Sequence, residues 1–158
     1  MKARLLALLV CASPVTAQEL VFSTSGLRAC LAGGGAETCI GMAAEACMEN
    51  TPGGYSTVAM GGCLSYEHRF WDDRLNAVYQ RALPRARAAD ADNGGFGASQ
   101  AETLRDMQRA WIPFRDATCD FEYSQWGGGT GGGPAMSECL MRETAKQTLY
   151  LESYAGRL

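Results

Sequence analysis

The chain has 158 residues and carries 17 acidic against 14 basic side chains, which gives a formal net charge of −3. This length fits one domain that can bury about two-thirds of its unfolded surface. A net acidic chain would be repelled by phosphate backbones, so its charge argues against nucleic-acid binding.

The N-terminus has the three-part pattern of a secretory signal. Lys2 and Arg4 supply positive charge, residues 5–12 form a short apolar run, and Val15-Thr16-Ala17 offers small residues to a signal peptidase. We expect cleavage after Ala17, which leaves one domain over residues 18–158 with a net charge of −5. The apolar run is too short to cross a bilayer, and no later segment is long enough, so no membrane anchor is predicted. We predict a periplasmic or secreted protein.

Seven cysteines are present, and Cys11 falls within the predicted signal. Val10 precedes it where a lipoprotein signal has a small residue, which argues against lipidation. An even number of remaining cysteines in an exported chain predicts a disulfide framework; they are Cys30, Cys39, Cys47, Cys63, Cys119 and Cys139. Six cysteines allow about fifteen sets of pairs. Among them we favour the pairing of sequence neighbours: Cys30 with Cys39, Cys47 with Cys63, and Cys119 with Cys139.

Glycine clusters at 33–35, 53–54, 94–97 and 127–133 divide the chain into segments with helical patterns. The first two segments are short. Residues 25–32 predict a turn or two of helix, and residues 37–50 predict a small helix that ends at the Pro-Gly-Gly turn that follows. Together they form a short disulfide-bonded N-terminal subregion, over residues 18–55.

The third segment is the longest, and Ser56 or Thr57 is its expected N-cap. Apolar residues at 60, 64, 71, 75, 78 and 82 fall on one helical face. Pro84 predicts a kink or an end, because proline cannot donate the helical hydrogen bond.

The fourth segment begins with the capping box Ser99-Gln100-Ala101-Glu102. Its expected core stripe has regular helical spacing: Leu104, Met107, Trp111, Phe114, Thr118 and Phe121. Pro113 predicts a local bend. The fifth segment starts near Pro134 and places residues 140, 144, 148 and 151 on one side. The sequence therefore predicts an all-α fold: a small antiparallel helical bundle stapled by three disulfides, with a short helical N-terminal appendage.

No arrangement of residues predicts catalysis or a cofactor. His68 is the only histidine, and with Asp72 it would offer a metal just two ligands, so we interpret it as a surface residue without metal. The glycine run 127–133 lacks the Lys-Ser or Lys-Thr of a phosphate-binding loop, so it is either a flexible loop or one that grips a partner. The paired carboxylates read as solvated faces rather than acid/base machinery.

The aromatic and charged side chains of the helices have mostly structural interpretations. Helical spacing places Trp71 and Trp111 in the core rather than against a sugar. Trp126 lies outside any stripe and is the expected exposed contact residue. Arg115-Asp116 is expected to form a half-buried tie between helices, and Asn76 near Tyr79 is expected to do the same for the third helix.

Several of these residues form a recognisable combination. They are Cys63-Leu64, Glu67, Trp71-Asp72, Leu75-Asn76, Tyr79, Gln108, Trp111-Ile112, Phe114-Arg115-Asp116 and Cys119, followed by a Gly-Gly stretch, Cys139-Leu140 and Thr144. The combination resembles the LprI-type lysozyme inhibitor family over roughly residues 47–151. The resemblance implies a helical, disulfide-bonded, exported bacterial domain that binds and blocks lysozyme, and it supports the pairing of sequence neighbours. It implies no catalytic residue; its matched positions read as scaffold, namely Trp71, Leu75, Asn76, Tyr79, Trp111, Arg115 and Asp116.

Our leading hypothesis is an exported binding protein that occludes the groove of a cell-wall hydrolase. Lysozymes are often basic, so an acidic chain would be steered toward them. The expected contact residues are Trp126, Asp120 and Glu122, beside the glycine loop. The alternative is a binding module for another envelope protein or a glycan fragment, without lysozyme inhibition.

Overall fold

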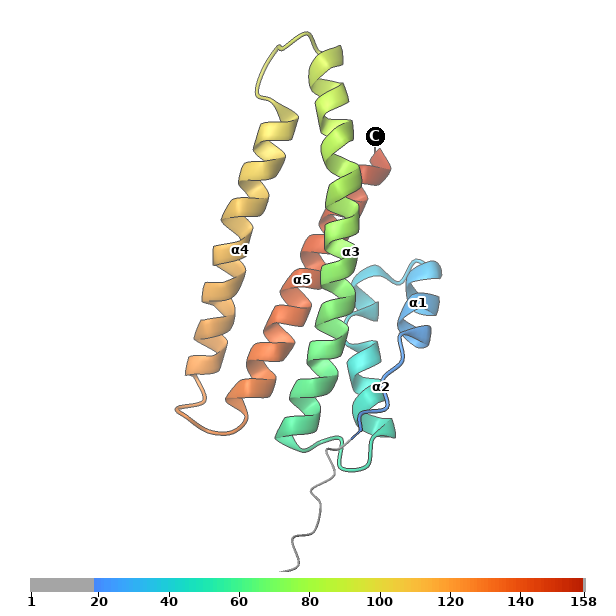
Figure 1. Ribbon diagram of the computed structural model, residues 1–158, viewed down its shortest axis with the longest axis vertical. Helices are drawn as coiled ribbons and strands as arrows, with labels where there is room; N and C mark the ends of the chain where they lie inside the picture. The colour runs from blue at the N-terminus through green and yellow to red at the C-terminus, as the bar shows by residue number, and fades with distance from the viewer. Residues whose placement is uncertain (1–18, 158) are drawn as a thin grey trace, which may run out of the picture.

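The computed structural model describes residues 19–157, and the predicted signal at 1–17 lies outside them. Three long helices stand side by side, and α4 runs antiparallel to both α3 and α5 (Figure 1). The short helix α2 packs on the lower part of α3, on the side away from α4, and α1 packs against α2. No strand occurs within this range, so the predicted all-α bundle is confirmed. The elements are α1 Ser25–Ala32, η1 Ala36–Cys39, α2 Met42–Asn50, α3 Thr57–Asp92, α4 Gln100–Ser124 and α5 Gly132–Arg157.

Local signals set the helix starts as predicted. The Ser56 hydroxyl accepts from Ala59 N at 3.3 Å, and the Ser99 hydroxyl accepts from Glu102 N at 3.2 Å. Each bond satisfies a backbone donor that the first helical turn leaves without a partner. In residues 19–157 no helix is both long and apolar enough to span a membrane.

Both internal prolines are accommodated within continuous helices. The expectation that α3 could end at Pro84 is wrong, because the helix continues to Asp92. Pro84 is exposed, so water can satisfy the carbonyl that its missing N–H leaves free. Val78, Ala82 and Ala86 are buried on the other face and hold the helix in place across the proline.

The segment predicted as one helix over residues 37–50 is instead two elements. A short 3-10 turn ends at Cys39, and α2 begins after Gly41, whose φ of 96° lies in the left-handed region. A side chain at Gly41 would be strained in that conformation. Cys39 lies just before this break and forms a disulfide with Cys30 of α1.

Three disulfides join the cysteines as expected, with Cα–Cα distances of 5.4–5.8 Å. Cys30–Cys39 closes the turn after α1, Cys47–Cys63 ties α2 to α3, and Cys119–Cys139 ties α4 to α5. Each bridge closes a loop in the unfolded chain, which lowers the conformational entropy of that chain and so favours the folded state.

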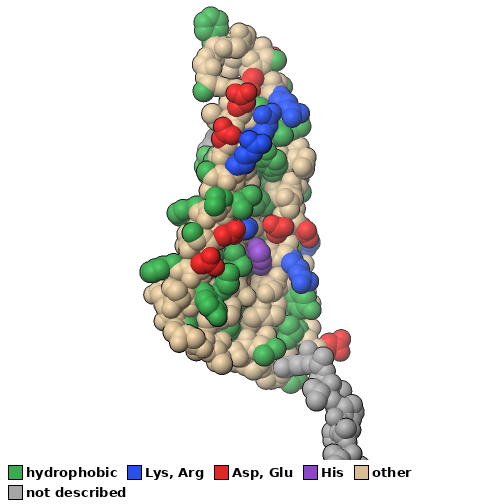
Figure 2. All heavy atoms as spheres, turned by 60° about the vertical axis from the view of Figure 1, so that its left-hand side comes forward, with side chains coloured by type: hydrophobic (Ala, Val, Ile, Leu, Met, Phe, Trp, Pro, Cys, Tyr) green, Lys and Arg blue, Asp and Glu red, His purple; other side chains and the backbone are tan. Residues whose placement is uncertain are grey.

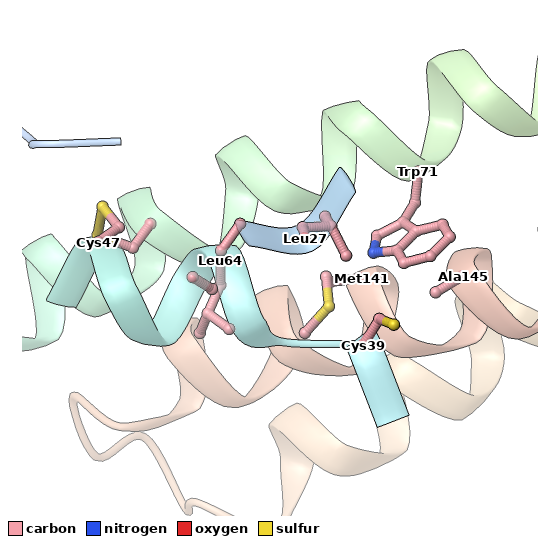
Figure 3. Packing of buried hydrophobic residues seen from close by; sticks show 10 residues of the cluster. Leu27, Cys39, Cys47, Leu64, Trp71, Met141 and Ala145 are labelled. Carbon is pink, nitrogen blue, oxygen red and sulfur yellow. A yellow bond between two sulfur atoms is a disulfide. The ribbon is translucent and has the colours of Figure 1, made fainter. Parts of the chain in front are cut away.

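We call residues 19–72 and 113–148 the lower half, and residues 73–112 and 149–156 the upper half, as they stand in Figure 1. Each half has its own buried cluster. In the lower cluster the indole of Trp71 packs toward Met141 and Ala145 (Figure 3). The buried side chains of the upper cluster are all aliphatic; it comprises Leu75, Val78, Ala82, Ala86, Ala101, Leu104 and Leu151.

The predicted core stripe of α4 is only half correct. Leu104 is buried and Trp111 is half-buried, but Phe114 and Phe121 are 63% and 65% exposed. Phe114 follows Trp111 by three residues, which displaces it by about 60° around the helix. Only α3 and α5 pack against α4, so this flank has no neighbour within residues 19–157. Figure 2 shows hydrophobic side chains projecting from the α4 side of the molecule.

Candidate functional site

Glu67, one of the residues that resemble the family, is fully buried and serves as a structural tie. Its carboxylate accepts from Gly41 N at 2.7 Å, Ala44 N at 2.8 Å and Trp71 Nε1 at 2.9 Å. A carboxylate at the start of α2 satisfies free backbone N–H groups and complements the positive helix end. Sequence reasoning missed this role, because the backbone partners lie 23 and 26 residues away.

The other scaffold positions on α3 line its inner face or its edge. Trp71 and Leu75 are buried, and Tyr79 is half-buried against the upper cluster. The Trp71 carbonyl accepts from the Thr148 hydroxyl at 3.2 Å, which links α3 to α5. Asn76 is exposed and donates to Asp72 of its own helix at 3.2 Å, so the expected tie through Asn76 is wrong.

The Arg115-Asp116 pair also differs from its prediction. Arg115 donates through Nε and Nη2 to Asp116 Oδ1 at 2.9 and 2.7 Å, within α4 rather than between helices. Its guanidinium lies 4.9 Å from the ring centroid of Trp111. The pair therefore orients the half-buried Trp111 by a cation–π contact instead of fastening a second helix.

His68 is partly buried, whereas the sequence predicted a surface residue. Its Nε2 atom is inaccessible to solvent and has no hydrogen-bond partner within the described chain. Burial, followed by the charge of Arg115, lowers the pKa of His68, while the carboxylate of Asp72 opposes this. Within residues 19–157, no group of three or more His, Cys, Asp or Glu side chains could hold a metal ion.

A groove of about 490 Å³ lies in the lower half, where α2, the start of α3, the start of α5 and the α4–α5 loop meet. The charged side chains of the groove are Glu45, Glu138 and Arg142. We call it the methionine groove after Met42, Met48, Met60 and Met141, which line it together with Ile40, Tyr55, Leu64 and Trp126. Methionine side chains are flexible and polarizable, which suits a surface that must adapt to a partner.

Trp126 lies in this groove and is 51% exposed. A Cβ added at Gly131 would lie 2.1 Å from an indole carbon, so only glycine allows the ring to lie across the loop. Gly127 and Gly128 have positive φ values of 55° and 86°, which other residues rarely adopt. The glycine run is thus fitted to Trp126, and the sequence alone gave no sign of this contact.

The three predicted contact residues do not form one site. Trp126 lines the methionine groove, whereas Asp120 and Glu122 are exposed on the last turns of α4, outside the groove lining. Phe121 and Tyr123 are exposed beside them. The methionines that line the groove were not identified from the sequence, because they lie on three different helices that only the fold brings together.

Charge is distributed unevenly between the two halves. The lower half holds eleven acidic and five basic side chains, whereas the upper half holds six of each. One of the eleven, Glu67, is buried. The methionine groove therefore opens at the acidic end of the molecule.

This arrangement defines a disulfide-bonded helical scaffold with an apolar groove. The chain belongs to the lysozyme inhibitor LprI family, whose profile matches residues 47–151. An uncharacterized protein of Rhizobium meliloti (strain 1021) is 32% identical over 93 residues, covering 57% of this chain and 67% of the relative. An uncharacterized 17.7 kDa protein in the puhA 5' region of Rhodobacter capsulatus is 27% identical over 121 residues, 74% of either chain. No solved structure matches the chain.

Proposed function

We propose that this protein is exported and binds a basic cell-wall hydrolase of the lysozyme type, blocking the enzyme's substrate groove without catalysing a reaction. Membership of an inhibitor family supports this proposal. Three disulfides support export, because such bonds persist in oxidising compartments such as the periplasm or the extracellular space.

The observation on which the proposal rests is the methionine groove with Trp126 at the acidic end. Lysozymes cleave their glycan between two carboxyl groups in a groove, and many of them are basic. An excess of acidic side chains in the lower half would steer such an enzyme toward this end. The apolar groove would then bury side chains of the partner once the two surfaces meet.

The construction of the loop favours a tight contact. Tryptophan is a frequent source of binding energy at interfaces, since it buries a large area with few rotatable bonds. The indole of Trp126 already rests on Gly131, and Cys119–Cys139 closes the segment that contains both. Less conformational entropy is therefore lost when a partner binds.

A titration of the processed protein against several lysozymes, with cell-wall hydrolysis as the readout, tests the proposal. We expect inhibition that weakens as salt rises, because screening shortens the range of the attraction. W126A should weaken inhibition by roughly 30-fold, which corresponds to about 2 kcal/mol for a central interface tryptophan.

The matched control is F96A, which removes an aromatic side chain that is 90% exposed in the loop between α3 and α4. This variant should inhibit like the wild type. Absence of inhibition of every lysozyme class at micromolar protein would contradict the proposal. Capture of a different envelope protein by the wild type but not by W126A would instead favour the alternative binding module.

A further inference from the structure

A second groove, of about 380 Å³, lies against the α3 face between α1 and α5. It shares no lining residue with the methionine groove. On α3 its residues Phe70, Arg74, Ala77 and Arg81 follow one another by four, three and four positions, so they lie on one helical face. Because Arg28 of α1 also lines it, we call it the arginine groove.

Two of its three guanidinium groups are held in place by the fold. Arg74 donates to both carboxylate oxygens of Glu152, through Nε at 2.6 Å and Nη2 at 3.2 Å. Arg28 donates through Nε to the Thr24 hydroxyl at 3.0 Å, and its guanidinium lies 5.0 Å from the ring centroid of Phe70. Both arginines are thus fixed before any ligand arrives, and each keeps N–H groups that these bonds do not use.

The remaining charged groups of the groove are available. The side chains of Arg81 and Asp73 make no hydrogen bond or ion pair with any residue that the structure describes. With Glu152, the lining holds three guanidinium groups and two carboxylates. The local balance is therefore positive, opposite in sign to the −5 of the processed chain.

We propose that the arginine groove binds a carboxylate monoanion attached to an apolar or aromatic body. A guanidinium fork matches the two oxygens of a carboxylate. Phe70 and the small Ala77 offer the apolar surface against which the body of such a ligand packs. Asp73 and Glu152 disfavour a doubly charged phosphate, because like charges in a confined groove repel each other.

The test is a titration of the processed protein, followed by backbone amide NMR, with benzoate, phenyl phosphate and the neutral benzamide as probes. Benzoate should give saturable shifts centred on residues 70–81. Benzamide and phenyl phosphate should bind at least tenfold more weakly. R81Q should reduce the affinity for benzoate at least tenfold, and its folding should be unaffected because Arg81 is exposed and has no partner among the described residues.

R87Q is the matched control, since Arg87 is exposed on α3 but outside the groove lining. Its benzoate affinity should equal that of the wild type. Equal benzoate binding by R81Q and wild type overturns the proposal, as do non-saturable shifts spread over many arginines. Phenyl phosphate that binds as tightly as benzoate overturns the carboxylate assignment. None of these outcomes depends on lysozyme, so the proposal stands or fails separately from the inhibition described above.

Discussion

The lower and upper halves of the bundle are stabilised by different means. The lower half contains all three disulfides, the buried Glu67 carboxylate and a cluster built around Trp71. The upper half has no disulfide among the described residues and depends on aliphatic side chains and a capped helix start. Cross-links are therefore concentrated where the methionine groove lies, which fixes the groove's walls, while the upper ends of the three long helices pack without a cross-link among the described residues.

The largest expected effect comes from removing the buried carboxylate of the lower half. E67A leaves the N–H groups of Gly41 and Ala44 and the indole N–H of Trp71 without their acceptor. We expect a loss of about 3–5 kcal/mol of unfolding free energy, since each buried donor without a partner costs about 1–3 kcal/mol. Urea unfolding followed by circular dichroism measures this loss. The control is E49A, which changes an exposed glutamate on α2. Equal stability of the two variants would show that the hydrogen bonds of Glu67 do not stabilise the fold as described.

The next effect concerns the disulfide beside the glycine loop. The double variant C119A/C139A should lose about 3 kcal/mol, because the unfolded chain regains the freedom of the closed segment. Thermal unfolding measures the change. The control is R109A, a substitution at an exposed position of the upper half, which should change the unfolding free energy by close to zero. An unchanged melting temperature would mean that the lower half does not depend on this cross-link.

A smaller effect is expected at the cap of the upper half. Asp90 accepts from the Ser99 hydroxyl and from the backbone N–H groups of Gln100 and Ala101 at 2.6–3.1 Å. These bonds lower the pKa of Asp90 below its usual 3.8, with the Ser99 hydroxyl the largest cause. A lowered folded-state pKa means that the stabilisation is fully present above the ordinary value and is lost as pH falls through the folded-state pKa.

D90N should therefore be less stable than wild type at neutral pH, and the gap should close as pH drops below 3.8. Chemical unfolding at a series of pH values from neutral to strongly acidic measures the gap. D92N, an exposed neighbour at the end of α3, controls for general charge effects. A gap that persists unchanged at the lowest pH would assign the effect to something other than the ionised cap.

The smallest effects are expected at the exposed lower part of α4, which can be compared with its buried upper part. F114A and F121A should each change unfolding free energy by less than about 0.5 kcal/mol, as expected for exposed positions. L104A, in the buried upper part of the helix, should cost about 2–3 kcal/mol. A loss above 2 kcal/mol for either phenylalanine would show that this flank is packed in solution.

Features that depend on residues close together in the chain could be predicted from the sequence, whereas contacts between residues far apart in the chain could not. The N-caps Ser56 and Ser99 and the cysteine pairs join residues close in the chain, so short patterns reveal them. The exposure of Phe114 depends on how many helices surround α4, which its own spacing does not encode. Of the candidate site, Trp126 was found because it falls outside any stripe, while the methionines that surround it are assembled only by the tertiary fold.

The most extensive helix interface joins α3 to α5, although α4 lies between them in sequence. The contact between Trp71 and Thr148 spans 77 residues, and the pair Arg74–Glu152 spans 78. Contacts at such separations form late, because the intervening chain must first be ordered or confined. When the chain emerges N-terminus first from a ribosome, the interface between α3 and α5 therefore cannot form until α5 has emerged. The interface between α3 and α5 therefore closes only where both helices are present together.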